Sequence, residues 1–222
     1  MSTLRKIIKK CGISKYLYIF GFGMRVKVTL LLFCSLFFFV ACQVKRTGGL
    51  PLDEMAEGDL AFRCGRGIFS RIVTTAEEEG VYSHIGLVVR DNGKWKVAHA
   101  VPGEHEFKGD FDRVKLEDIE TFFAPDRAFR GCLVRTGVKI PARLPEKAVR
   151  AARDSVEFDS DYDCDDPSKV YCTEFVWRLF MDEGVDLSEG RRTSVNVIGI
   201  SGDIILPEHI LHYSGNTQYY HF

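Results

Sequence analysis

The sequence lacks several features that would reveal a function directly. Its seven cysteines include no C-x-x-C pair, so the spacing of a zinc ribbon or a thioredoxin-type site is missing. Thirty Lys and Arg stand against 31 Asp and Glu, and this balance indicates no charged partner such as nucleic acid. No uninterrupted apolar run reaches the roughly 20 residues that cross a bilayer. What remains is an ordinary globular composition, with 45% hydrophobic and 27% charged residues in a chain of 222.

The charges are unevenly distributed along this nearly neutral chain. Residues 1–41 contain seven basic side chains and no acidic one. Arg25 and Lys27 precede about 14 largely apolar residues, which is the layout of a secretory signal peptide. The segment ends in Phe39-Val40-Ala41-Cys42, which resembles a bacterial lipobox, although Phe39 stands where Leu is usual. We therefore predict that residues 1–41 are a signal segment and that Cys42 is the lipidation site.

The start of the signal segment has a second interpretation. Met24 would open a signal of ordinary length, so residues 1–23 are interpreted as an upstream extension or a mis-chosen start. An uncleaved anchor reaching back to Tyr16 is the alternative, but Arg25 and Lys27 interrupt its apolar run. Cleavage before Cys42 leaves 181 residues with 23 basic and 31 acidic side chains, a net charge of −8. This acidic remainder has the length of one domain and does not suit nucleic acid.

The remainder is expected to have a short tether over residues 42–57 and a folded domain over residues 58–222. Its hydrophobic periodicity predicts an α+β fold with an antiparallel sheet packed against helices. The expected strands begin after Gly58 and cover 84–90, 95–101 and 128–136. The expected helices cover 68–78, 116–123, 145–158 and 172–183, with an acidic loop at 159–169 and an irregular tail containing one helical turn at 207–212.

A hairpin places two histidines on one face of the sheet. Asn92-Gly93 is typical of a type I′ turn, and a two-residue turn there pairs Asp91 with Lys94. In this register His84 and His99 are diagonal neighbours, roughly 7–8 Å apart at the backbone, with Gly86 leaving room between them. A slip of one residue would place the two histidines on opposite faces. Paired imidazoles can act as a base and the group that orients it.

Cys172 is the candidate nucleophile for such a base. It lies where the acidic loop becomes a helix, and the positive end of a helix lowers the pKa of a thiol. The free N–H groups of the first turn can also bind an oxyanion. A thiolate, a histidine base and a polar orienter together indicate a cysteine acyl-transfer enzyme.

Two blocks carry a resemblance to a known family. Residues 82–88 (YSHIGLV) and 170–177 (VYCTEFVW) resemble the signature blocks of permuted papain-like amidases of the YaeF/YiiX type, relatives of the NlpC-like cell-wall peptidases. Further matches are Gly58-Asp59-Leu60, Tyr162-Asp163 and residues 206–210 (LPEHI). The resemblance implies a circularly permuted papain-like catalytic domain over residues 58–222. It also implies that Cys172 is the nucleophile, His84 the general base and His99 the third polar residue, where relatives often have Glu.

The resemblance implies a lipid-anchored cysteine hydrolase of the cell envelope, on the outer membrane or the periplasmic face of a Gram-negative cell. It would cleave an amide bond in a peptidoglycan-type peptide or another small amide through a thioester, without a cofactor. An acyltransferase similar to lecithin retinol acyltransferase, acting on lipid or N-acyl substrates, is one alternative. A zinc site built from Cys172, His84 and His99 and a non-catalytic envelope-binding lipoprotein are the others.

The remaining polar residues do not form a recognisable catalytic or metal-binding motif. The acidic loop does not match an EF-hand, because Cys164 and Val170 stand where Gly and Glu are needed. Tyr82 and Glu174 lie beside the candidate site, where Glu174 serves equally well as a helix cap. Three further histidines are interpreted as surface residues and three cysteines as structural: His209, His212, His221, Cys64, Cys132 and Cys164.

Overall fold

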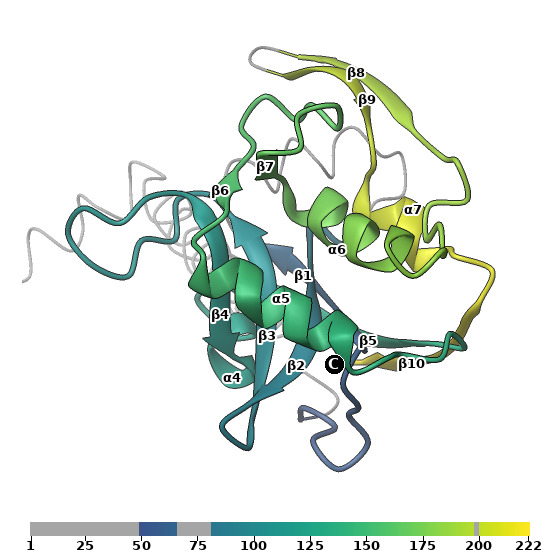
Figure 1. Ribbon diagram of the computed structural model, residues 1–222. Helices are drawn as coiled ribbons and strands as arrows, with labels where there is room; N and C mark the ends of the chain where they lie inside the picture. The colour runs from purple at the N-terminus through teal and green to yellow at the C-terminus, as the bar shows by residue number, and fades with distance from the viewer. Residues whose placement is uncertain (1–48, 66–80, 198–199) are drawn as a thin grey trace, which may run out of the picture. The chain divides into compact units, whose positions relative to one another are not determined.

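A large, mostly antiparallel sheet forms the frame of the α+β domain (Figure 1). The computed structural model describes residues 49–65, 81–197 and 200–222, which belong to one unit spanning Thr47–Phe222. The predicted signal segment, Cys42 and the predicted helix at 68–78 lie outside these residues. The eight strands of the sheet are, in spatial order, β10 (Asn216–His221), β5 (Ala128–Thr136), β1 (Leu60–Gly65), β2 (His84–Asp91), β3 (Lys94–Val101), β4 (Arg113–Asp118), β6 (Glu157–Phe158) and β7 (Lys169–Val170).

Helices pack against both faces of this sheet. They are α4 (Ile119–Phe122), α5 (Arg143–Arg153), α6 (Cys172–Met181) and α7 (Pro207–Leu211). In Figure 1, α5 crosses β2, β3 and β4, with α6 above it. A separate hairpin of β8 (Thr193–Val197) and β9 (Ile200–Ile204) extends at the top of this view. The pairing is antiparallel throughout the large sheet except between β6 and β7.

Two hydrophobic cores follow from the alternation of side chains along the strands. Ile85, Leu87 and Val89 of β2 belong to the larger core, with the apolar sides of α5 and α6. Val88 belongs to the smaller core, where Phe122 of α4 packs. Successive residues of a strand point to opposite faces, so each core covers one face of the sheet. His84 has the parity of Val88 and therefore lies on the face that α4 covers.

The predicted hairpin register is confirmed. Asp91 pairs with Lys94 and Leu87 with Ala98 across β2 and β3. Asn92 and Gly93 have φ angles of 51° and 77°, the positive values that a type I′ turn requires at both central positions. The turn and the apolar alternation therefore select the same register.

Two predicted helices are wrong in their bounds. Residues 116–118 of the helix expected at 116–123 are the end of β4, and α4 itself spans only Ile119–Phe122. The helix expected to reach Phe158 ends at Arg153, because Ser155 adopts a left-handed φ of 55° and Phe158 joins the sheet. In both cases a short strand adjoins a helix without a Gly or Pro between them to mark the boundary.

The tail is more ordered than the sequence indicates. It contains the β8–β9 hairpin and the edge strand β10, in addition to the helical turn at α7. In β10, Tyr219 pairs with Val134 of β5. This strand has no buried side chain, so hydrophobic alternation does not mark it.

Residues 50–57, which the sequence analysis assigns to the tether, pack on the domain. Met55 is buried in the smaller core, and the Ala56 N–H donates to the Asp59 carboxylate over 2.8 Å. Arg135 of β5 binds the same carboxylate with two nitrogens, both at 2.8 Å. Within the described ranges no helix has the length and hydropathy of a membrane span.

Candidate active site

A row of buried polar side chains crosses four strands on the face that α4 covers. The register pairs Arg63 of β1 with His84 of β2, and His99 of β3 with Lys115 of β4. Glu117 of β4 lies two residues beyond Lys115 and therefore on the same face. All five side chains are buried, which is costly for polar groups unless each is paired.

The two predicted histidines meet at the centre of this row. His84 Nε2 and His99 Nδ1 are 2.9 Å apart in a hydrogen bond, and the ring centroids are 5.1 Å apart. Both rings pack against Phe122, at centroid distances of 5.8 and 5.0 Å. The diagonal arrangement therefore brings the imidazoles into direct contact, while Gly86 leaves the room that a side chain would fill.

Glu117 faces the far side of His99. His99 Nε2 and Glu117 Oε2 face each other at 3.3 Å, and neither buried atom has a hydrogen-bond partner among the described residues. The second carboxylate oxygen of Glu117 lies 2.5 Å from Nη1 of Arg127. Burial raises the pKa of Glu117, but His99, Arg127 and Arg63 outweigh burial and lower this pKa to about 2. Glu117 is therefore a carboxylate at neutral pH.

These contacts assign the tautomers of both rings. An ionised carboxylate only accepts, so His99 carries its proton on Nε2 and donates it toward Glu117. His99 Nδ1 is then an acceptor, and His84 Nε2 must donate to it. The lone pair of His84 is left on Nδ1. The network thus holds His84 in the tautomer that can take a proton from a neighbouring group.

Both histidines are neutral in the folded protein. Burial lowers the pKa of His84 well below its ordinary value of 6.5, and the charge of Arg63 lowers it further. Burial also lowers the pKa of His99, although Glu117 opposes that shift. His84 is therefore available as a base below pH 6.5.

Cys172 opens α6 and is positioned from both sides. The Ile205 N–H donates to the Tyr171 hydroxyl over 2.9 Å, and the Thr173 hydroxyl donates to the Ile205 carbonyl over 2.5 Å. The N–H groups of Ile85, Thr173 and Cys172 itself point to the sulfur. Since Ile85 follows His84 directly, the thiol lies beside the backbone at the start of β2.

The expectation of a resting thiolate is wrong. Burial raises the pKa of Cys172 to about 11, although the three N–H groups and the charge of Arg63 act in the opposite direction. Removal of the sulfur from water therefore outweighs the helix terminus. With His84 also neutral, the resting pair is a thiol and an imidazole rather than an ion pair.

Alkylation of Cys172 by iodoacetamide is expected to report this state. With a pKa near 11, the thiolate fraction rises about tenfold per pH unit, so the alkylation rate should rise steeply from pH 7 to pH 9. The rate is measured by mass spectrometry of the peptide that carries Cys172. Cys64, which is also unbridged and half-buried, provides the internal comparison. A rate that is already constant below pH 8 would instead indicate a thiolate with a lowered pKa.

Sequence reasoning missed four charged residues around the histidines. Arg63 pairs with Glu104 and donates to the Phe122 carbonyl over 2.9 Å, and its guanidinium lies 4.4 Å from the centroid of the Phe122 ring. Glu104 also binds Arg127 at 2.6 Å, and Arg127 binds Glu117. Charges of opposite sign therefore alternate from Arg63 through Glu104 and Arg127 to Glu117. The strict alternation of charged and apolar residues over 113–117 is the signal that identifies β4.

Tyr162 is a further residue near the nucleophile. Its φ is 57°, a left-handed value that is uncommon outside glycine. Its ring centroid lies 5.1 Å from that of Tyr171. Burial raises the pKa of Tyr162, and the proximity of the Cys172 sulfur raises it further. The acidic loop at 159–169 therefore places the Tyr162 side chain near the Cys172 thiol.

Glu174 caps the helix that begins at Cys172. Its carboxylate accepts the Tyr171 N–H over 3.2 Å and binds Arg178 at 2.6 Å. Burial raises the pKa of Glu174 to about 7 against the effect of Arg178. Arg178 in turn donates to the carbonyls of Cys164 and Asp166, so this pair joins α6 to the acidic loop.

The other histidines make local contacts. His221 Nδ1 lies 3.0 Å from the Tyr82 hydroxyl, which connects the last strand to β2. His209 contacts the Thr193 hydroxyl and the Leu206 N–H, and His212 binds Glu208. None of these histidines belongs to the row on the α4 face.

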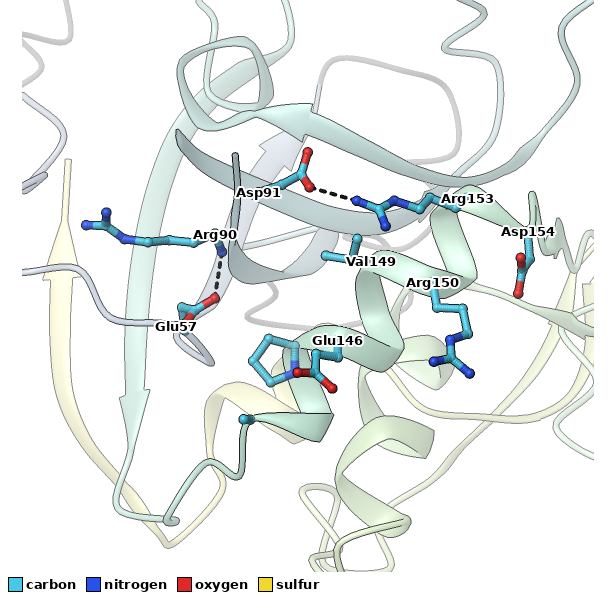
Figure 2. Close-up of a pocket in the computed structure, with 10 residues that line it drawn as sticks. Glu57, Arg90, Asp91, Glu146, Val149, Arg150, Arg153 and Asp154 are labelled. Carbon is cyan, nitrogen blue, oxygen red and sulfur yellow. Dashed lines mark hydrogen bonds and ion pairs between the residues drawn. The ribbon is translucent and has the colours of Figure 1, made fainter. Parts of the chain in front are cut away.

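Figure 2 shows a pocket at the opposite end of β2. It is lined by residues of both signs beside the β2–β3 turn and α5, and Arg153 crosses it to bind Asp91 at 3.0 Å. None of the three candidate catalytic residues lines it. This pocket is therefore separate from the candidate active site.

Comparisons with known proteins show a likeness of fold. No protein-family model matches the sequence, and no curated protein matches it. Among solved structures, the chain is similar to the metalloprotein YiiX from Escherichia coli O157:H7, a DUF1105 protein, with a TM-score of 0.56 and 18% identity. The match covers 72% of this chain and 94% of that one. The fold is therefore YiiX-like.

Proposed function

We propose that this protein is a cysteine hydrolase that cleaves an amide bond through a thioester intermediate. Cys172 is the nucleophile, His84 the general base and His99 the residue that orients His84. The observation that carries the proposal is the 2.9 Å hydrogen bond between His84 and His99, near a helix-terminal thiol whose pKa the neighbouring Ile85 N–H lowers. A nucleophile, a base and an orienter are the groups that acyl transfer requires.

The first half of the reaction acylates the thiol. His84 Nδ1 takes the proton of Cys172 as the sulfur attacks the carbonyl carbon. The new C–S bond and the oxyanion form together, and the oxyanion faces the N–H groups at the start of α6. His84 then gives its proton to the amide nitrogen, the C–N bond breaks, and the amine leaves a thioester on Cys172.

The second half of the reaction releases the acid. Water attacks the thioester carbonyl carbon, and His84 Nδ1 takes the proton of the water. The C–S bond then breaks, the carboxylic acid leaves, and the proton returns to the thiol. Because His84 and Cys172 are neutral at rest, the proton moves during attack rather than before it.

The proposed setting is the cell envelope. The basic segment, the apolar run and Cys42 support export and a lipid anchor, and the YiiX-like fold supports a family of permuted papain-like amidases. Peptidoglycan-type peptides and other small amides are the proposed substrates. The proposed domain therefore acts close to a membrane surface.

A metal centre at the same residues fits the geometry poorly. The similar structure is described as that of a metalloprotein. In this chain, however, His84 Nε2 and His99 Nδ1 share one proton in a hydrogen bond, and His99 Nε2 faces Glu117. Three of the four ring nitrogens therefore already face another side chain of the row. In the described part of the chain, no three His, Cys, Asp or Glu side chains form a metal-binding group.

A panel of peptidoglycan fragments and N-acyl amides tests the proposed function. The purified full chain is incubated with each compound, and the products are identified by mass spectrometry. Release of a free acid and an amine supports hydrolysis. An acyl product formed only with an added amine or alcohol would indicate an acyltransferase, and the absence of both products across the panel would contradict the proposal.

A further inference from the structure

The histidine row ends in a carboxylate that the three proposed catalytic residues do not include. Glu117 is almost completely buried, yet no substrate-sized space separates it from His99, because their facing atoms are 3.3 Å apart. It lies on β4, one strand beyond His99 and two beyond His84. Three adjacent strands thus contribute one titratable group each to a single chain of contacts.

We infer that Glu117 is a positioning residue for the proposed general base and acts on His84 through His99. This inference rests on the proposed function and adds a fourth member to its machinery. The Nε2 proton of His99 is directed at the Glu117 carboxylate across 3.3 Å, which leaves His99 Nδ1 to accept from His84 and His84 Nδ1 to receive the thiol proton. The Glu117 carboxylate therefore determines, through His99, which nitrogen of His84 carries a proton.

The inference follows from the ambiguity of an imidazole. Neutral histidine has two tautomers, and a pair of histidines joined by one hydrogen bond can donate in either direction. In one direction His84 has its lone pair on Nδ1, as base catalysis at Cys172 requires. In the other direction His84 Nδ1 carries a proton and cannot act as the base. An ionised group at the far end of the pair selects the first direction.

The surroundings of Glu117 preserve its charge. Arg127 binds the oxygen that His99 leaves free, and Arg63 contributes a second positive charge. Glu104 lies between these arginines and binds both of them. Arg63 also lies across from His84 and opposes a positive charge there. The arginines thus keep Glu117 ionised, while Glu104 limits the positive charge that they present.

Glu117→Gln tests the inference in the full chain labelled with ¹⁵N-histidine. The side chain keeps its size but loses its charge, and its amide can donate as well as accept. We expect wild-type His84 and His99 to show the Nε2–H tautomer by NMR, and the variant to lose this preference at one or both rings. For an amide that the wild-type chain cleaves, kcat should fall about 10–100-fold with KM within twofold.

Two further variants complete the test. Asp118→Asn removes a carboxylate from the adjacent position of β4, where Asp118 pairs with Lys96 at 3.3 Å, and should leave the tautomers unchanged. Glu117→Asp keeps the charge and should retain the tautomers even where the glutamine variant does not fold. Unchanged tautomers in a folded Glu117→Gln variant would overturn the inference. If the wild-type chain cleaves no amide but Glu117→Gln still loses the tautomer preference, the result would support the role of Glu117 and contradict only the proposed function.

Discussion

Cys172→Ala is expected to reduce amide hydrolysis by at least about 10⁴-fold. The reason is that no covalent intermediate can form without the sulfur, whereas the hydrogen bond between His84 and His99 does not depend on the thiol. The measurement is the initial rate of amine release from the cleaved amide. Mass spectrometry of the quenched wild-type reaction should show a thioester on Cys172.

Cys64→Ala is the matched control for this loss. Cys64 is also half-buried and unbridged, but it follows Arg63 in β1 and therefore points away from the face that carries His84 and His99. Its replacement should leave hydrolysis within twofold of the wild-type rate. Activity that survives in a folded Cys172→Ala variant would show that another group performs the attack.

Gly86→Ala is expected to destabilise the domain and to impair the histidine pair together. A Cβ at this position would lie 2.4 Å from Val97 Cγ1 and 2.9 Å from both the Ala98 carbonyl oxygen and His99 Cβ. Real contacts are longer, so β2 and β3 must separate or shift. Overpacking of this kind costs about 1–3 kcal/mol, and displacement of a catalytic group by about 1 Å lowers the rate about 10²-fold.

Thermal unfolding and hydrolysis measure the two effects separately. For a domain of this size, the loss in stability should lower Tm by about 3–10 °C. Hydrolysis is then compared at a temperature at which both proteins are folded. Gly49→Ala serves as the control, since an added Cβ there meets nothing within 4 Å. Wild-type Tm and activity in Gly86→Ala would show that the hairpin accommodates a side chain between its histidines.

The histidine pair could be predicted from the sequence because its determinants are local. The Asn92-Gly93 turn fixes the register, and the register fixes which side chains share a face. The start of α6 at Cys172 could also be predicted, from the change between a polar loop and an apolar periodic segment. The proximity of Cys172 to the start of β2 could not, since it depends on packing between distant parts of the chain.

Glu117 was missed because its charge suggested the wrong environment. Leu116, Ile119 and Phe122 have helical spacing, so the sequence predicts a helix over residues 116–123. In the structure, Lys115 and Glu117 of β4 point to the face that α4 covers, where Lys115 pairs with Asp110 and Glu117 faces His99. A sequence pattern records polarity but does not show which partners a buried charge will find.

The predicted pKa of Cys172 was wrong for a similar reason, because it also depends on distant parts of the chain. A helix terminus lowers the pKa of a cysteine, and this local effect is visible in the sequence. The burial that raises the pKa of Cys172 to about 11 comes from the folded domain as a whole. The sequence therefore identified the residue but assigned it the wrong resting charge.

The β2–β3 hairpin and Cys172 are far apart in the sequence, and this distance sets the order in which the candidate site forms. A β-hairpin can form within about 1–10 μs from residues that are close in the chain. The β2–β3 hairpin therefore depends on a short segment, and His84 meets His99 as soon as it closes. Cys172 follows only after β4, β5 and α5, and it reaches the start of β2 by long-range packing. During synthesis, the two histidines can thus meet before the proposed nucleophile has been added to the chain.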